Sequence, residues 1–164
     1  DTEFRHARRG STTVAGKRIL VVDDNPTNLE ILENHLSSWR AEVTCADSAA
    51  RAIAILDSED ASFDLAILDW HMPDTDGLEL AAAIRWDLGR HELRLMMLSS
   101  LANSIDQDQC DDLCISRQIT KPIRQDDLFD ALLAVLGEAP GQRVRHHQLP
   151  QAERLLFGLC ASCP

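Results

Sequence analysis

Five short runs rich in branched apolar residues recur along the chain, and most of them end abruptly at a polar or charged side chain. The predicted strands are residues 18–22, 42–45, 65–68, 94–98 and 115–120. The strongest of these runs lack alternation between apolar and polar residues, so both faces of the sheet are expected to be covered. Helical signals separate successive runs. This pattern predicts an α/β fold: a doubly wound, five-stranded parallel sheet of order 2-1-3-4-5 with helices on both faces.

Helix signals follow each predicted strand. Asn25 is expected to cap the first helix, with Pro26 at its first position. Asp47 or Ser48 is expected to cap the second, and a third begins at Gly77. The fourth, from Asn103 to Leu113, is unusually polar, and Gln125–Leu136 closes the series with a clear amphipathic pattern.

The predicted domain spans residues 16–137. Residues 1–15 are expected to be an N-terminal tail or residues left from cloning, and 138–164 a linker and C-terminal tail. The net charge is −11, and residues 16–137 hold 10 Lys or Arg against 23 Asp or Glu. Nucleic-acid phosphates would be repelled by such a surface, so no direct nucleic-acid partner is expected.

The compartment is predicted from the cysteines and from apolar content. Five cysteines, of which Cys45, Cys110 and Cys114 lie in predicted regular structure, favour free thiols in a reducing compartment. The C-terminal pair Cys160 and Cys163 lacks the second ligand pair of a zinc site. No window resembles a membrane span or a secretory signal, so a cytoplasmic location without membrane contact is expected.

Three carboxylates are predicted to meet at one edge of the sheet. Asp23 and Asp24 follow the first strand and Asp69 follows the third, and these strands are neighbours in the order 2-1-3-4-5. At an effective dielectric of about 20, two carboxylates 4 Å apart repel by roughly 4 kcal/mol, so the cluster needs a compensating cation, bound protons, or both. Oxygen ligands favour a hard ion, and Mg²⁺ is the natural choice beside a phosphate. The alternative is that some of these acids, Asp24 above all, are helix caps.

Two further strand ends supply groups suited to phosphoryl chemistry. Ser99 ends the fourth strand and offers a hydroxyl donor. Lys121 follows the fifth strand and offers a positive charge for a phosphate oxygen. Lys17 and Lys121 are the two lysines of the chain, whereas arginine fills the other basic positions. The alternative for Lys121 is an ordinary surface charge.

Four motifs together resemble those of response-regulator receiver domains of two-component signalling. They are VVDDNP at 21–26, LDWHMPDTDG at 68–77, LSS at 98–100 and TKPI at 120–123. The resemblance covers about residues 17–137 and is closest to receivers attached to hybrid sensor histidine kinases.

The resemblance implies a phosphorelay function. Asp69 would accept a phosphoryl group from a phosphohistidine of a histidine kinase or histidine phosphotransfer domain. Asp23, Asp24, Asp69 and the main-chain carbonyl of His71 would bind Mg²⁺, with Asp23 acting through water. Ser99 and Lys121 would hold the phosphoryl oxygens. The chain would not be an enzyme in the usual sense, since transfer and slow dephosphorylation act on itself.

The chain departs from the family at two positions near the site. Gln118 stands where the family usually has Tyr or Phe, so the usual coupling through a moving ring is in doubt. Cys114 stands where Gly is common after the fourth helix, so the turn there is expected to differ.

Three other functions are weaker. A haloacid-dehalogenase-like phosphatase would need a second Asp where His71 stands. The glycines around Gly10 and Gly16 precede a strand and have the wrong spacing for a phosphate-binding loop. A receiver-fold interaction module without signalling is the remaining alternative, although all five chemical positions are intact.

Overall fold

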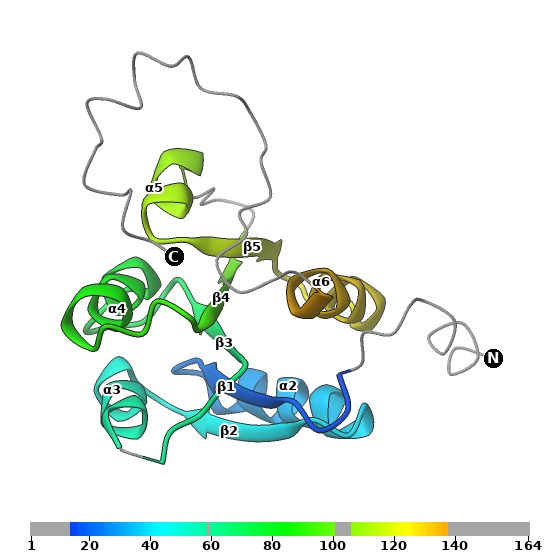
Figure 1. The fold of residues 1–164 in the computed structure, drawn as a ribbon. Helices are drawn as coiled ribbons and strands as arrows, with labels where there is room; N and C mark the ends of the chain where they lie inside the picture. The colour runs from blue at the N-terminus through cyan, green and yellow to red at the C-terminus, as the bar shows by residue number, and fades with distance from the viewer. Residues whose placement is uncertain (1–13, 59, 101–105, 138–164) are drawn as a thin grey trace.

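The computed structural model describes residues 14–58, 60–100 and 106–137. Its centre is one parallel sheet in the order β2-β1-β3-β4-β5 (Figure 1). The strands are β1 (Arg18–Val22), β2 (Glu42–Ala46), β3 (Leu65–Asp69), β4 (Arg94–Ser99) and β5 (Ile115–Thr120). The predicted fold class and strand order are confirmed. β2, β3 and β4 each run one residue further than predicted, so Asp69 and Ser99 are the last residues of their strands.

Helices cover both faces of the sheet. They are α2 (Pro26–Ser38), α3 (Ala49–Asp57), α4 (Gly77–Ala82), the π-helical continuation η1 (Ala83–Asp87), α5 (Gln107–Asp112) and α6 (Gln125–Gly137). In Figure 1, α3, α4 and α5 lie on one side of the sheet and α2 and α6 on the other. This alternation is the doubly wound arrangement that the five β-α units predict.

Side-chain caps fix where α2, α3 and α4 begin. The Asn25 side chain accepts a hydrogen bond from the Thr27 N–H, with Pro26 following it. Ser48, rather than Asp47, caps α3 by accepting from the Arg51 N–H. Asp76 caps α4 in a reciprocal capping box with Glu79. Each cap satisfies N–H groups that the first turn leaves without helical partners.

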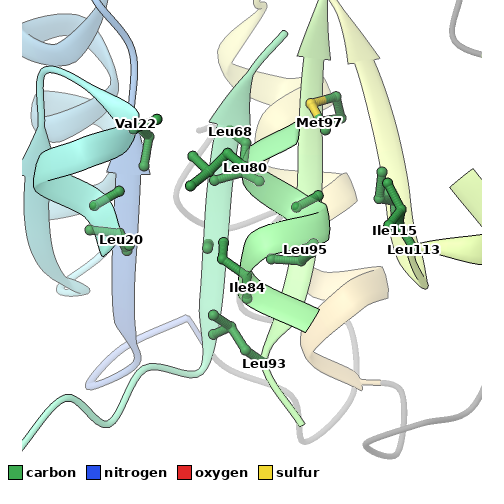
Figure 2. Close-up of a cluster of buried hydrophobic side chains, with 14 of the residues drawn as sticks. Leu20, Val22, Leu68, Leu80, Ile84, Leu93, Leu95, Met97, Leu113 and Ile115 are labelled. Carbon is green, nitrogen blue, oxygen red and sulfur yellow. The ribbon is translucent and has the colours of Figure 1, made fainter. Parts of the chain in front are cut away.

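The core consists of two apolar layers, one on each face. Figure 2 shows the layer beneath α4, where side chains from β1, β3, β4 and β5 meet Leu80 and Ile84. The opposite layer joins the sheet to α2 and α6 through residues such as Leu32, Leu36 and Leu132. Val14 is buried in this second layer, two residues before the predicted start of the domain. Because both faces are buried, the central strands β1, β3 and β4 carry apolar residues at nearly every position, whereas the edge strands β2 and β5 are more polar.

The helix predicted to begin at Gly77 changes geometry partway. After Ala82 it continues as η1, in which the Leu88 N–H donates to the Ala83 carbonyl, five residues back. The buried Arg85 in this turn donates to the carbonyls of Leu113 and Cys114. The sequence pattern missed this wider turn, because hydrophobic spacing does not distinguish α from π over a single turn.

Cys114 has the left-handed φ of 52°. Gly is favoured in this conformation, so Cys114 retains the turn conformation with a less favourable residue, and the predicted change of turn is not seen. Nearby, α5 is described from Gln107. The predicted start of that helix at Asn103, and the C-terminal Cys160 and Cys163, lie outside the described residues. Within the described part of the chain, no helix has the length and apolar character needed to cross a membrane.

Candidate functional site

Three carboxylates converge at the carboxyl edge of β1 and β3. One oxygen from each of Asp23, Asp24 and Asp69 lies within 4.8 Å of the others. Asp23 and Asp69 are buried, whereas Asp24 is exposed. The predicted meeting of these acids is therefore confirmed. Asp24 is not the helix cap, since Asn25 holds that position.

Lys121 joins the two buried acids. Its Nζ lies 2.9 Å from Asp69 Oδ1 and 3.2 Å from Asp23 Oδ2. Its backbone N–H donates to the Ser99 carbonyl at 2.7 Å, which places the residue at the end of β4. The Lys121–Pro122 peptide bond is cis. The reading of Lys121 as an isolated surface charge is wrong, because its ammonium group partly neutralises the acid cluster.

The ionisation of Asp69 and Lys121 reflects both burial and their contact. Burial raises the pKa of Asp69, and the charge of Asp23 adds to this rise, against the lowering effect of Lys121 and of the His71 backbone N–H. Burial lowers the pKa of Lys121, but its hydrogen bond to Asp69 and the charges of both acids outweigh that effect and raise it. Lys121 is therefore held as a cation beside Asp69.

Two neutral donors also bind the Asp23 carboxylate. Its Oδ1 accepts from the Asn25 N–H at 2.9 Å, and its Oδ2 accepts from Asn28 Nδ2 at 3.1 Å. These two hydrogen bonds connect the start of α2 to the residue that follows β1. Asn28 was not predicted as a site residue. Its position five residues after Asp23, on the first turn of a predicted helix, was the available signal.

Ser99 is buried and holds a partner that the sequence did not predict. Gln118 Nε2 donates to Ser99 Oγ at 2.8 Å. Gln118 pairs with Met97 across β4 and β5, and Ser99 pairs with Thr120. From the sequence, Gln118 was noted for the aromatic ring that it replaces. The structure adds that the replacing amide binds the site hydroxyl.

Gly77 allows the first turn of α4 to lie against the end of β3. A Cβ there would lie 2.5 Å from the Asp69 carbonyl oxygen and 2.7 Å from Met97 Sδ. The Gly77 N–H donates to the Trp70 carbonyl at 2.9 Å. Gly is therefore required by close packing here. His71, in the loop between them, is exposed, and its ring stacks beside that of Trp70.

Comparison with known proteins gives the family. The response regulator receiver domain family matches residues 19–133. Two-component response regulator ORR24 of Oryza sativa is 37% identical over 119 residues, which cover 69% of this chain and 18% of that protein. ORR23 from the same species is 34% identical over 128 residues, which cover 74% of this chain and 17% of that protein. The chain thus spans less than a fifth of the length of these relatives.

Solved structures agree on the fold. Chemotaxis protein CheY4 of Vibrio cholerae superposes with a TM-score of 0.67 at 24% identity, covering 74% of this chain and all of that one. The receiver domain of a Pseudomonas aeruginosa sensor histidine kinase, solved with a magnesium ion coordinated in its active-site cleft, gives 0.64 at 26% identity. That match covers 76% of this chain and 100% of the other. Through its motifs, its sheet order and this family match, the chain belongs to the response regulator receiver domains of two-component systems.

Proposed function

We propose that Asp69 accepts a phosphoryl group from a phosphohistidine in a Mg²⁺-dependent reaction. The contact of Lys121 with Asp69 at 2.9 Å, inside a cluster of three carboxylates, carries the proposal. A carboxylate at a strand end, with a fixed cation beside it, is a nucleophile placed where added negative charge can be neutralised.

The donor set fits Mg²⁺. The three carboxylates offer oxygen ligands, and hard divalent cations prefer oxygen. The exposed position of Asp24 leaves room for the water ligands that Mg²⁺ usually keeps. Asp24 and Asp69 would bind the ion directly, Asp23 through water, and the His71 carbonyl would complete the protein ligands. When bound, the ion would neutralise charge that develops on the transferred group.

The residues of the chain position the transfer. In the step proposed, an Asp69 carboxylate oxygen forms a bond to phosphorus while the phosphorus–nitrogen bond of the phosphohistidine breaks, and its electron pair stays on the imidazole. Lys121 and Ser99 would bind the phosphoryl oxygens, because Ser99 ends β4, the neighbour of β3, and Lys121 follows β5 and contacts Asp69. Later attack by water would return Asp69 and free phosphate. The chain would act on itself and not as a conventional enzyme.

The proposed partner is a histidine kinase or a histidine phosphotransfer domain. The solved receiver from a sensor histidine kinase supports attachment to a hybrid kinase, whereas the rice relatives are response regulators. The cytoplasm is the proposed compartment, since the thiols of Cys45 and Cys110 are not in disulfides.

The test is phosphorylation of the full chain by phosphoramidate and Mg²⁺, followed by intact mass. We expect a single phosphate on the wild type, none on Asp69→Asn, and none in EDTA. Asp64→Asn, a matched change at the residue directly before β3, should behave as the wild type. If Asp69→Asn gains phosphate as readily as the wild type, the acceptor is wrong. If the wild type gains none, an interaction module becomes the better description.

A further inference from the structure

The amide of Gln118 lies inside the site, although no chemistry proposed so far uses it. Gln118 stands on β5, half-buried, three residues before Lys121. Its side chain lies on the face of the sheet that carries Met97 and Ser99, since Ile119 packs into the opposite layer. Its Nε2 reaches Ser99 Oγ at 2.8 Å, a good hydrogen-bond distance.

The hydroxyl of Ser99 has one proton to donate and two lone pairs to accept with. Ser99 is 2% exposed, so bulk water contributes little to orienting its hydroxyl. A bond donated by the Gln118 amide fills one lone pair and leaves the hydroxyl proton free for another acceptor. A partner that accepted from Ser99 would instead compete for that proton.

The acceptor would be a phosphoryl oxygen on Asp69. Asp69 pairs with Leu98 across β3 and β4, so Ser99 is the next residue along that edge. The Ser99 carbonyl also accepts a hydrogen bond from the Lys121 N–H. This bond holds the backbone of Lys121 beside that of Ser99, so the ammonium group and the hydroxyl belong to neighbouring residues at the same edge of the sheet. Two hydrogen bonds in line, from amide to hydroxyl to phosphoryl oxygen, polarise one another in a buried site.

We infer that Gln118 is a positioning residue of the phosphoacceptor site: by donating to Ser99 Oγ, it holds the hydroxyl ready to donate to the phosphoryl group. The inference rests on the proposed function of Asp69. It gives Gln118 a role through Ser99 and not through contact with the transferred group.

The experiment measures the rate of phosphorylation of the full chain by phosphoramidate with Mg²⁺. Gln118→Met keeps the length of the side chain and removes the donor. Gln118→Glu keeps the shape but can only accept. Ser99→Ala removes the hydroxyl, and the double variant Ser99→Ala with Gln118→Met completes a cycle. Gln109→Met, the same change at an exposed position on α5, is the control.

We expect Gln118→Met to slow phosphorylation by roughly three- to tenfold, the effect of losing one hydrogen bond. Gln118→Glu should be slower still, because its carboxylate competes for the hydroxyl proton and adds negative charge. In the Ser99→Ala background, Gln118→Met should change the rate by less than about twofold, since the residue acts through the missing hydroxyl. A purely structural role would give an equal loss in both backgrounds.

Two results would overturn the inference while leaving Asp69 as the acceptor. One is a Gln118→Met rate equal to that of the wild type, and the other is a full Gln118→Met effect in the Ser99→Ala background. Should Gln118→Met fail to fold, Gln118→Leu takes its place in the cycle. A wild type that gains no phosphate, or an Asp69→Asn variant that gains it, overturns the proposed function and this inference together.

Discussion

The two halves of the carboxyl edge of the sheet are built on opposite principles. The acid half, at the ends of β1 and β3, brings together Asp23, Asp24 and Asp69. The donor half, at the ends of β4 and β5, brings together Ser99, Gln118 and Lys121. The acid half repels itself and needs a cation, whereas the donor half supplies one fixed charge and two neutral donors. Lys121 belongs to the donor half and contacts two residues of the acid half, so the site depends on the position of the two halves relative to each other.

Removing that link should have the largest effect. Lys121→Met keeps the stem of the side chain and deletes the ammonium group that contacts Asp69 and Asp23. We expect Mg²⁺-dependent phosphorylation to slow by about 10²- to 10³-fold, the range for losing one preorganised donor at developing charge. The measurement is the phosphorylation rate by intact mass, with Lys17→Met, at the other lysine, as control. A Lys121→Met rate within threefold of the wild type would mean that the halves work independently.

The packing that supports the acid half can be broken without touching a charge. Gly77→Ala would place its Cβ 2.5 Å from the Asp69 carbonyl oxygen, so the start of α4 must shift. We expect a loss of about 3 kcal/mol in the free energy of unfolding, as for overpacking of a core. Gly89→Ala is the matched control, because its Cβ meets nothing within 4 Å and its φ is +64°. Its cost should be only about 1 kcal/mol from backbone conformation.

Urea unfolding of both glycine variants measures the difference. Equal losses in the free energy of unfolding would show that the start of α4 can move away from β3 at little cost. The acid half would then be less rigid than its contacts indicate.

The acid half was more predictable than the donor half. Asp23, Asp24 and Asp69 could be placed together because parallel topology alone brings the ends of neighbouring strands to one edge. The parallel sheet with both faces covered followed from apolar runs that lack alternation, and 2-1-3-4-5 is a common strand order of such doubly wound sheets. In the donor half, topology placed Ser99 and Lys121 correctly at that edge, but it could not show that Gln118 would reach Ser99. Such a contact depends on one side-chain rotamer, which hydrophobic pattern does not encode.

Two other features exceeded what pattern can predict. The π-helical turn at Ala83–Asp87 depends on one extra residue per turn, below the resolution of spacing. To predict the contact of Lys121 with Asp69 and Asp23, the conformation of the loop after β5 would have to be known. The sequence motifs indicate that conformation only through their resemblance to the family. The sequence therefore predicted which groups share the edge, whereas the structure gives the bonds between them.

The two acids at the end of β1 should respond differently to neutralisation. Asp24 is exposed and adds repulsion to the cluster, so Asp24→Asn should raise the melting temperature in EDTA by about 1 to 3 °C. Asp23 is buried and bound to Lys121 and Asn28, so Asp23→Asn should lower it by breaking those bonds. Mg²⁺ should stabilise both variants less than the wild type. Thermal unfolding with and without Mg²⁺ measures this; a rise for both acids would mean that repulsion outweighs the Lys121 contact.

The smallest effect is expected for the response of the face formed by α5, β5 and α6 to phosphorylation. For this face to respond, the donor half would have to change its conformation when the phosphoryl group binds. A ligand shifts a conformational equilibrium only by its differential affinity for the two states. Because Gln118 binds Ser99 in this structure, the hydroxyl is already held, and a phosphoryl group gains little by drawing it closer. We therefore expect beryllofluoride, a phosphoryl mimic, to leave the sedimentation coefficient of the full chain unchanged, as suits a relay that passes phosphate between histidines. Gln118→Tyr would restore a ring and remove the amide, so it should increase any response to the mimic. A clear shift of the wild type from monomer to dimer on adding the mimic would contradict this prediction. It would show that a phosphoryl group changes the conformation of this face despite Gln118, and that the donor half moves on phosphorylation.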